Sequence, residues 1–308
     1  MEALLDFWSA YSAAIAFGLV NSLFALSMYS VLSAGILSFT TVVFAAIGGF
    51  AAAQVIGTFG LPLWVAFPLA GIAGGIGSAI IAAIFLKLET HWMALASLAM
   101  VLITRVTVLN TPSLTGGVMG MMVPVRASVL ELTILVAIVA LVFYRLHNSW
   151  YGLAIRAVRE DAAAASTMGV SLRHIQLIAF LISGVVGGLA GAAMATTLQY
   201  ISADTFYLGV AFTMIAGTVL GGSFHWFGPI VGAFVFTALP SVTQAVLPEL
   251  QDIAKGVVLL VIMIYLPRGL IDPRARGLRK AARQRQDAAV REQDNASKLV
   301  KNAGQAHD

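Results

Sequence analysis

Ser149 to His174 reads SWYGLAIRAVREDAAAASTMGVSLRH, and this central polar segment divides a sequence that is otherwise almost free of charge. Its charged residues are Arg156, Arg159, Glu160, Asp161 and Arg173. The whole chain is 59% hydrophobic and only 10% charged, with a mean hydropathy of +0.91, which is more apolar surface than a soluble domain hides. The sequence therefore predicts an integral membrane protein. The central polar segment is expected to lie outside the bilayer as a short amphipathic helix that ends at Gly169.

The apolar runs on both sides of this segment are long enough to cross a membrane as helices. They extend for about 18 to 25 residues, which matches a hydrocarbon core about 30 Å thick at the helical rise. None of them alternates as the strands of a membrane barrel do. The expected fold is an all-α polytopic bundle of about eight to ten transmembrane helices. The expected spans are residues 11–32, 36–56, 63–86, 92–109, 130–144 and 175–198, two within 208–246, and 256–266.

The distribution of Lys and Arg predicts the domains and their orientation. Ten of the 18 basic residues lie at or after Arg268. We expect a transmembrane domain of residues 1–271 and a polar, basic, flexible tail of residues 272–308. If the tail is cytoplasmic, the opposite side receives only Arg126 and Lys255 of the remaining cations, as the positive-inside rule requires. The central polar segment is then cytoplasmic as well, and the two termini lie on opposite sides.

Polar residues near the end of the fourth expected span form a second feature. Arg105 either extends along the lipid to the headgroups or lines a polar pathway. Residues 110–127, which are rich in Gly and Pro, form either an exposed loop or a broken, re-entrant helix. The candidate residues of a pathway or an outer gate are Arg105, Asn110, Thr115, Gly116, Gly117 and Gly120.

Glycines indicate close helix packing and one tight turn. Small residues at helical spacing let membrane helices approach closely. We expect Gly187, Gly188 and Gly191 to serve this role. The apolar run of residues 208–246 is too long for one span, and we expect a turn at Gly221, Gly222, Gly228 and Pro229.

The sequence contains no motif that would support catalysis by this chain alone. The phosphate loop, the H-E-x-x-H pattern and the G-x-S-x-G pattern are absent, and there is no Cys. The five His are scattered, so neither a metal nor another cofactor is expected. The carboxylates fall at or beyond the ends of the expected spans, which argues against an ion-coupled carrier. The charged cluster at residues 156–161 is explained more simply as a solvated helix face than as the active site of a membrane enzyme.

Several motifs follow one another in a consistent order along the chain: LTGGVMG at 114–120, RAVRED at 156–161, MGV at 168–170, GGLAGA at 187–192, VLGG at 219–222, GPIVGA at 228–233 and LPRGL at 266–270. Together they resemble one permease family of bacterial ABC importers, the family for branched-chain (hydrophobic) amino acids. The likeness covers about residues 22–270. Within the family the chain looks like the longer of the two permease types.

This resemblance implies a role for the central polar segment. ABC importer permeases carry a cytoplasmic coupling helix with the pattern E-A-A-x-x-x-G, and residues 163–169 have that spacing, with Ala163 in the place of Glu. The implied ATPase-docking residues are Arg156, Arg159, Glu160, Asp161, Ala163, Ala164, Ala165 and Gly169. From its spacing alone, the same segment fits equally well a helix that lies on the membrane surface.

The resemblance also implies partners and a location. The partners are a second permease subunit, two ABC ATPase subunits that bind ATP and Mg²⁺, a periplasmic or extracellular solute-binding protein, and membrane lipid. No nucleic acid is implied, and the location is the bacterial inner membrane. Branched-chain amino acids are the implied solutes, while urea, short amides and aromatic acids are alternatives carried by close relatives. A secondary carrier is the alternative from another class, and it would transport solute without ATPases.

Overall fold

The computed structural model describes residues 2–88, 90–244 and 260, and all structural statements below concern these residues. Six described helices are long and apolar enough to cross a membrane, which confirms the expected all-α membrane fold. They are α1 (Glu2–Ser33), α2 (Thr40–Gly57), α3 (Leu63–Phe85), α4 (Thr90–Asn110), α6 (Val129–His147) and α9 (Leu172–Leu198). The last expected span, residues 256–266, and the tail, residues 272–308, lie outside the described residues.

Two shorter apolar helices occupy the run that was expected to hold two spans. They are α10 (Leu208–Gly221) and α11 (Gly228–Gln244). With 14 residues, α10 rises about 21 Å, which is less than a hydrocarbon core of about 30 Å. The non-helical residues 202–207 precede it. The chain after α9 therefore passes through a non-helical segment before it enters the short helix α10.

Helix α9 lies at the centre of the bundle and packs against α1, α2 and α3. A Cβ atom at Gly188 would collide with the carbonyl of Ala70 in α3, and one at Gly191 would collide with the carbonyl of Ala45 in α2. Gly187 faces α1 and α2. In lipid, helices associate through close van der Waals packing, which small residues permit. The three expected glycines therefore lie on faces of α9 that pack against its neighbours, and at Gly188 and Gly191 the backbones come too close for a Cβ atom.

Buried hydroxyl groups connect α1 to α9. Ser27 Oγ donates to the carbonyl of Ser183 at 2.7 Å, and Ser30 Oγ donates to the carbonyl of Ala179 at 2.9 Å. A hydroxyl group without a partner in an apolar environment costs free energy, so these bonds favour one rotation of α1 against α9.

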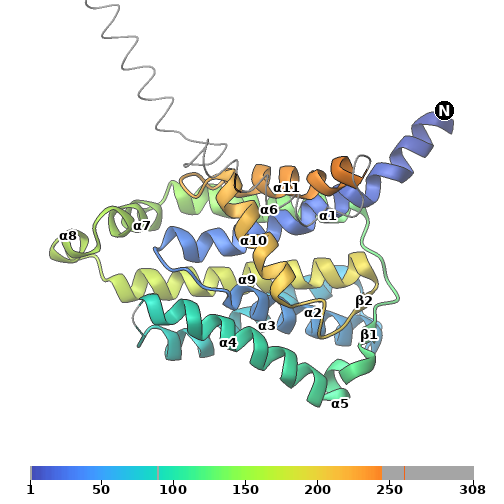
Figure 1. Ribbon diagram of the computed structural model, residues 1–308, viewed down its shortest axis with the longest axis horizontal. Helices are drawn as coiled ribbons and strands as arrows, with labels where there is room; N and C mark the ends of the chain where they lie inside the picture. The colour runs from blue at the N-terminus through green and yellow to red at the C-terminus, as the bar shows by residue number, and fades with distance from the viewer. Residues whose placement is uncertain (1, 89, 245–259, 261–308) are drawn as a thin grey trace, which may run out of the picture. The chain divides into compact units, whose positions relative to one another are not determined.

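The chain between α4 and α6 folds into short elements at the end of the bundle away from α7 and α8 (Figure 1). These are α5 (Pro112–Thr115), the 3₁₀ helix η1 (Gly117–Met119) and the strand β1 (Met121–Met122). Strand β1 pairs antiparallel with β2 (Tyr200–Ile201), with Met121 opposite Ile201. We call this the sheet end. The pairing connects residues 110–127 to the segment that follows α9.

Candidate functional site

The central polar segment folds as two helices that meet at a corner, and we call the pair the elbow. α7 (Trp150–Glu160) and α8 (Ala162–Thr167) are separated by Asp161, whose backbone is extended at φ −156° and ψ 107°. Asp161 Oδ1 accepts hydrogen bonds from the amides of Ala163 at 2.9 Å and Ala164 at 3.0 Å. The single expected helix is therefore corrected to two, because an Asp before an Ala run is a strong N-cap and begins a new helix.

Helix α7 attaches the elbow to the bundle by one apolar face. Its buried residues Ala154, Ile155 and Val158 form a small apolar cluster with Ala34, directly after α1, and with Ile175 of α9. The other face is exposed. This amphipathic arrangement fixes the position of α7 and leaves α8 projecting from the end of the bundle (Figure 1).

Helix α8 presents small side chains on its outer surface. Ala163 and Ala164 are exposed, whereas Ala165 is buried against the bundle. Met168 follows and is 84% exposed. Gly169 adopts φ +85°, with no atom within 4 Å of where its Cβ would lie. A short, small-residue helix with an adjacent exposed Met is a surface that a protein groove can cover closely.

Arg159 turns away from this exposed surface and contacts the chain between α10 and α11. Its Nη1 donates to the carbonyl of Ser223 at 2.6 Å, and its Nη2 donates to Ser223 Oγ at 2.9 Å. The guanidinium carbon lies 4.1 Å from the ring centroid of Phe224. The sequence predicted neither contact. Arg159 thus links the elbow to the α10–α11 turn, while Arg156 donates to the carbonyl of Gly152 within α7 at 2.9 Å.

The α10–α11 turn brings together the four residues expected to form it. Gly222 has φ +96°, and a Cβ atom at Gly221 would collide with the carbonyl of Gly228. Pro229 is the second residue of α11, where its missing amide hydrogen removes no helical hydrogen bond. His225 lies in this turn, and partial burial lowers its pKa. Its ring centroid is 5.1 Å from that of His147 at the end of α6.

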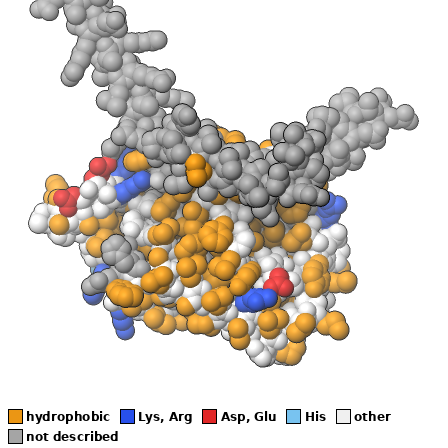
Figure 2. All heavy atoms as spheres, viewed as in Figure 1, with side chains coloured by type: hydrophobic (Ala, Val, Ile, Leu, Met, Phe, Trp, Pro, Cys, Tyr) orange, Lys and Arg blue, Asp and Glu red, His pale blue; other side chains and the backbone are white. Residues whose placement is uncertain are grey.

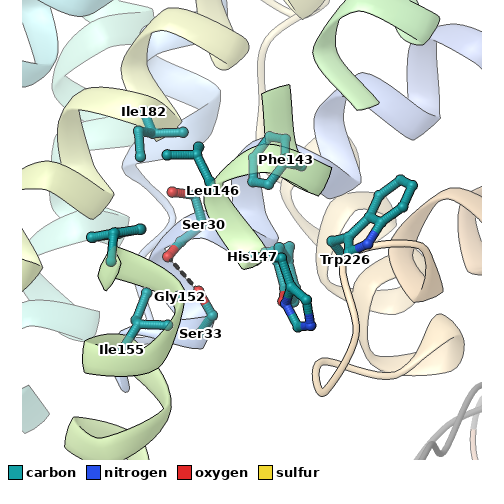
Figure 3. A pocket seen from close by; sticks show the side chains of 11 residues that line it. Ser30, Ser33, Phe143, Leu146, His147, Gly152, Ile155, Ile182 and Trp226 are labelled. Atoms are coloured by element: carbon teal, nitrogen blue, oxygen red, sulfur yellow. Dashed lines mark hydrogen bonds between the residues drawn. The ribbon is translucent and has the colours of Figure 1, made fainter. Parts of the chain in front are cut away.

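A small cavity lies beside the elbow, where α1, α6, α7 and α9 meet the α10–α11 turn (Figure 3). Its volume is about 30 Å³, far below the roughly 300 Å³ of small ligand pockets. His147 and Trp226 form one wall, and Ser33 donates to the carbonyl of Ser30 at 2.9 Å. The hydroxyl group of Tyr151 is buried without a partner among the described residues, and burial raises its pKa. This cavity is a packing gap at the elbow rather than a solute site.

A larger cleft of about 360 Å³ lies between α2, α3, α4 and α5. Its lining is almost entirely apolar, apart from four threonines of α4, α5 and the residue between them. Thr104 and Thr107 donate to the carbonyls of Met100 and Ile103, four residues earlier in α4. The cleft has no charged residue in its lining, so it offers apolar surface and no partner for a charged group.

The expected gate residues after Asn110 support the local structure of the sheet end. Asn110 and Thr115 both bond to backbone carbonyls of α4. Gly116, Gly117 and Gly120 all have positive φ angles. Arg105, the remaining member of the expected group, makes its contacts with the segment that follows β2.

Arg105 pairs with Asp204, which lies 99 positions later in the sequence. Its Nη2 is 2.7 Å from Asp204 Oδ1, and its Nε donates to the same oxygen at 3.0 Å. Its guanidinium carbon also lies 4.7 Å from the ring centroid of Tyr207. Sequence reasoning identified Arg105 but missed both partners, because Asp204 read as an ordinary loop carboxylate. The opposite charges of Arg105 and Asp204 were the only feature of the sequence that could have suggested their pairing.

Comparison with known families identifies the chain. A family model described as "Branched-chain amino acid transport system / permease component" matches residues 11–266, a range that includes the elbow, the α10–α11 turn and Arg105. The chain belongs to this family. The permease is 26% identical over 263 residues to the high-affinity branched-chain amino acid transport system permease protein LivM of Escherichia coli (strain K12). That alignment covers 74% of the permease and 62% of LivM, so the permease spans less than two thirds of this relative.

Other relatives of the permease carry the names of other solutes. The galactofuranose transporter permease protein YtfT of Escherichia coli (strain K12) is 25% identical over 265 residues, which cover 79% of the permease and 75% of YtfT. The guanosine ABC transporter permease protein NupQ of Bacillus subtilis (strain 168) is 31% identical over 127 residues, or 41% of the permease and 40% of NupQ. No solved structure matches the permease. Family membership thus gives an ABC permease without specifying its solute.

Proposed function

We propose that this permease is a transmembrane subunit of a bacterial ABC importer for branched-chain or related hydrophobic amino acids. It forms the pathway with a second permease subunit. Two ATPase subunits bind ATP and Mg²⁺ and perform the hydrolysis, so this chain is not itself an enzyme. A solute-binding protein delivers the solute from outside, and the elbow and the tail face the cytoplasm of the inner membrane. The family match over residues 11–266 supports this proposal.

The elbow is the proposed ATPase-docking site, and one observation carries this assignment. Helix α8 projects as an exposed, small-residue surface, while Arg159 bonds the helix before it to the α10–α11 turn. A displacement of α8 by an ATPase would move α7 as a packed unit. The bonds to Ser223 would then pull on two membrane helices. This is a direct mechanical path from nucleotide binding to the bundle.

A docking test follows from the exposure of Ala164. In the complex expressed with its neighbouring gene products, we expect Ala164→Arg to abolish co-purification of the ATPases, because the long charged side chain prevents close contact of α8 with a groove. The second permease should remain bound. The matched control is Phe59→Arg, which adds the same charge at an exposed turn of the sheet end. ATPases that stay bound to the Ala164→Arg complex would refute the docking assignment.

A second experiment addresses the solute. Proteoliposomes that contain the complete importer and its binding protein should accumulate labelled leucine only when ATP is supplied. The panel also includes guanosine, a hexose, urea and phenylalanine, which represent the solutes of relatives and the alternatives from sequence. Accumulation of another member in preference to leucine reassigns the solute. Accumulation by the lone permease without ATPases identifies a secondary carrier.

A further inference from the structure

The pair of Arg105 and Asp204 lies beside a helix that is long and apolar enough to cross a membrane. Arg105 is five residues before the end of α4, which is about 8 Å along the helix axis. On the other side of the pair, Phe206 packs edge-on against Phe50 of α2, with ring centroids 6.1 Å apart. Phe50 is itself seven residues before the end of α2. The non-helical residues 202–207 therefore turn back alongside the bundle after β2.

Both charged side chains of this pair are partly exposed at the surface of the molecule. The side chain of Asp204 is 73% exposed and that of Arg105 is 39% exposed. Exposed neighbours on α4, such as Leu102 and Val106, are apolar. On the face of the molecule that Figure 2 shows, hydrophobic side chains outnumber charged ones. Ionised groups and non-helical backbone beside a membrane helix are tolerated where water reaches them and not where they face lipid. Water at the open side of the pair, from a polar pathway or from the membrane surface, would solvate these charges.

We propose that Arg105 and Asp204 form a recognition site for the two charged ends of a zwitterionic amino acid. This inference rests on the proposed function and specifies the chemistry of its solute. The α-carboxylate binds the guanidinium of Arg105, and the α-ammonium binds the carboxylate of Asp204. Both bonds between the two residues end on Asp204 Oδ1, so Oδ2 and Arg105 Nη1 have no partner among the described residues. Tyr207 supports the guanidinium through its ring.

Charge balance gives this site its selectivity. With no solute, the two residues neutralise each other. A zwitterion that binds to Arg105 Nη1 and Asp204 Oδ2 contacts both groups, and the site remains neutral. A solute that lacks either charge makes only one of these two contacts and leaves the site with a net charge, so it binds less well. Neither of the two cavities described above has Lys, Arg, Asp or Glu in its lining, so neither offers this recognition.

The alternative role for the pair is a structural clip that holds residues 202–207 against α4. The two roles differ in what they do to solute preference. A clip supports the whole pathway, so its loss reduces the affinity for every solute by the same factor. A recognition site acts on one charged group of the solute, so its loss changes the ratio between solutes.

The experiment measures this ratio with three solutes of similar shape. The complete importer complex is placed in nanodiscs without its binding protein, and leucine, leucinamide and 4-methylpentanoate compete against labelled leucine. Leucinamide lacks the carboxylate, and 4-methylpentanoate lacks the ammonium group. We expect the intact complex to prefer leucine to either analogue by about tenfold or more.

The variants assign each charge to its partner. Arg105→Gln should remove most of the preference for leucine over leucinamide, and Asp204→Asn should remove most of the preference over 4-methylpentanoate. The double variant Arg105→Gln with Asp204→Asn leaves no unpaired charge, so it should assemble, and it should lose both preferences. Arg126→Gln, which removes an exposed cation between β1 and α6, should change neither ratio.

The outcomes separate this inference from the proposed function. If the intact complex neither binds nor imports any amino acid, the proposed function fails. If the intact complex takes leucine and the variants retain its preferences, or lose affinity for all three solutes equally, the proposed function stands and the recognition site is refuted.

Discussion

The two ends of the bundle are built in different ways. At the elbow, the decisive corner is local, because Asp161 caps the helix that begins at the next residue. At the sheet end, the decisive contacts join residues far apart in the chain, since Met121 pairs with Ile201 and Arg105 with Asp204. At a local corner, the neighbouring loop can adjust when one side chain changes. A contact between distant segments cannot adjust in this way, so we expect substitutions at the sheet end to cause the larger losses in the free energy of unfolding.

The largest expected effect is from Gly120→Ala at the sheet end. Gly120 has φ +67° and ψ −167°, a region open essentially to glycine alone, and its Cβ would collide with the carbonyl of Ile201. We expect a loss of about 3 kcal/mol or more in the free energy of unfolding, from backbone strain and the collision together. The measurement is thermal unfolding of the solubilised complex.

The matched control for this comparison is Gly169→Ala at the elbow. Gly169 also has a positive φ, but its Cβ would meet open space. Only the strain of the left-handed backbone remains, which is about 1 kcal/mol. Equal losses from the two variants would contradict the distinction between the two ends.

Arg159→Met tests the polar contact between the elbow and the α10–α11 turn. It removes two hydrogen bonds to Ser223 and the contact with Phe224, which should lower the free energy of unfolding by about 2 kcal/mol. If the elbow couples the ATPases to the bundle, this variant should keep its ATPases and hydrolyse ATP while solute uptake falls. The ratio of uptake to hydrolysis is the measurement. Arg173→Met, at an exposed position in the first turn of α9, should leave that ratio unchanged.

Asp161→Ala should have a smaller effect, because it removes only a local cap. Loss of the side-chain acceptor for the amides of Ala163 and Ala164 should cost about 1 kcal/mol. Asp161→Asn keeps an acceptor oxygen and should cost less than Asp161→Ala. Thermal unfolding compares the two. A loss for Asp161→Ala as large as that for Gly120→Ala would show that the corner is more than a local feature.

The smallest expected effect is the pH dependence contributed by His225. Burial lowers its pKa below the ordinary value of 6.5, so the unfolded chain binds a proton more readily than the folded one. The stability that this residue contributes is present above about pH 6.5 and is lost as the pH falls below it. His225→Gln should remove this small part of the acid sensitivity between pH 7 and pH 5. The exposed His174 is the control, and an identical change from His174→Gln would contradict the assignment to His225.

Much of the elbow and little of the sheet end was predictable from sequence. The polar segment, its end at Gly169 and its amphipathic character follow from composition and from the hydrophobic pattern. The division at Asp161 is also encoded locally, by an Asp before an Ala run, but the regular spacing of the Ala run up to Gly169 predicts one helix. Nothing in the sequence indicated that Arg159 turns toward Ser223, since an Arg beside Glu160 reads equally well as solvated.

The sequence by itself determined that this chain is a membrane protein, where its long helices lie, and which family it resembles. Those properties depend on apolar runs, on glycine spacing and on ordered motifs, which are all local along the chain. Only the tertiary structure decided that Arg105 meets Asp204, that β1 meets β2, and that the elbow contacts the α10–α11 turn. The physical reason is that periodicity reports whether a side chain is buried or exposed, whereas its partner is selected by how the helices pack.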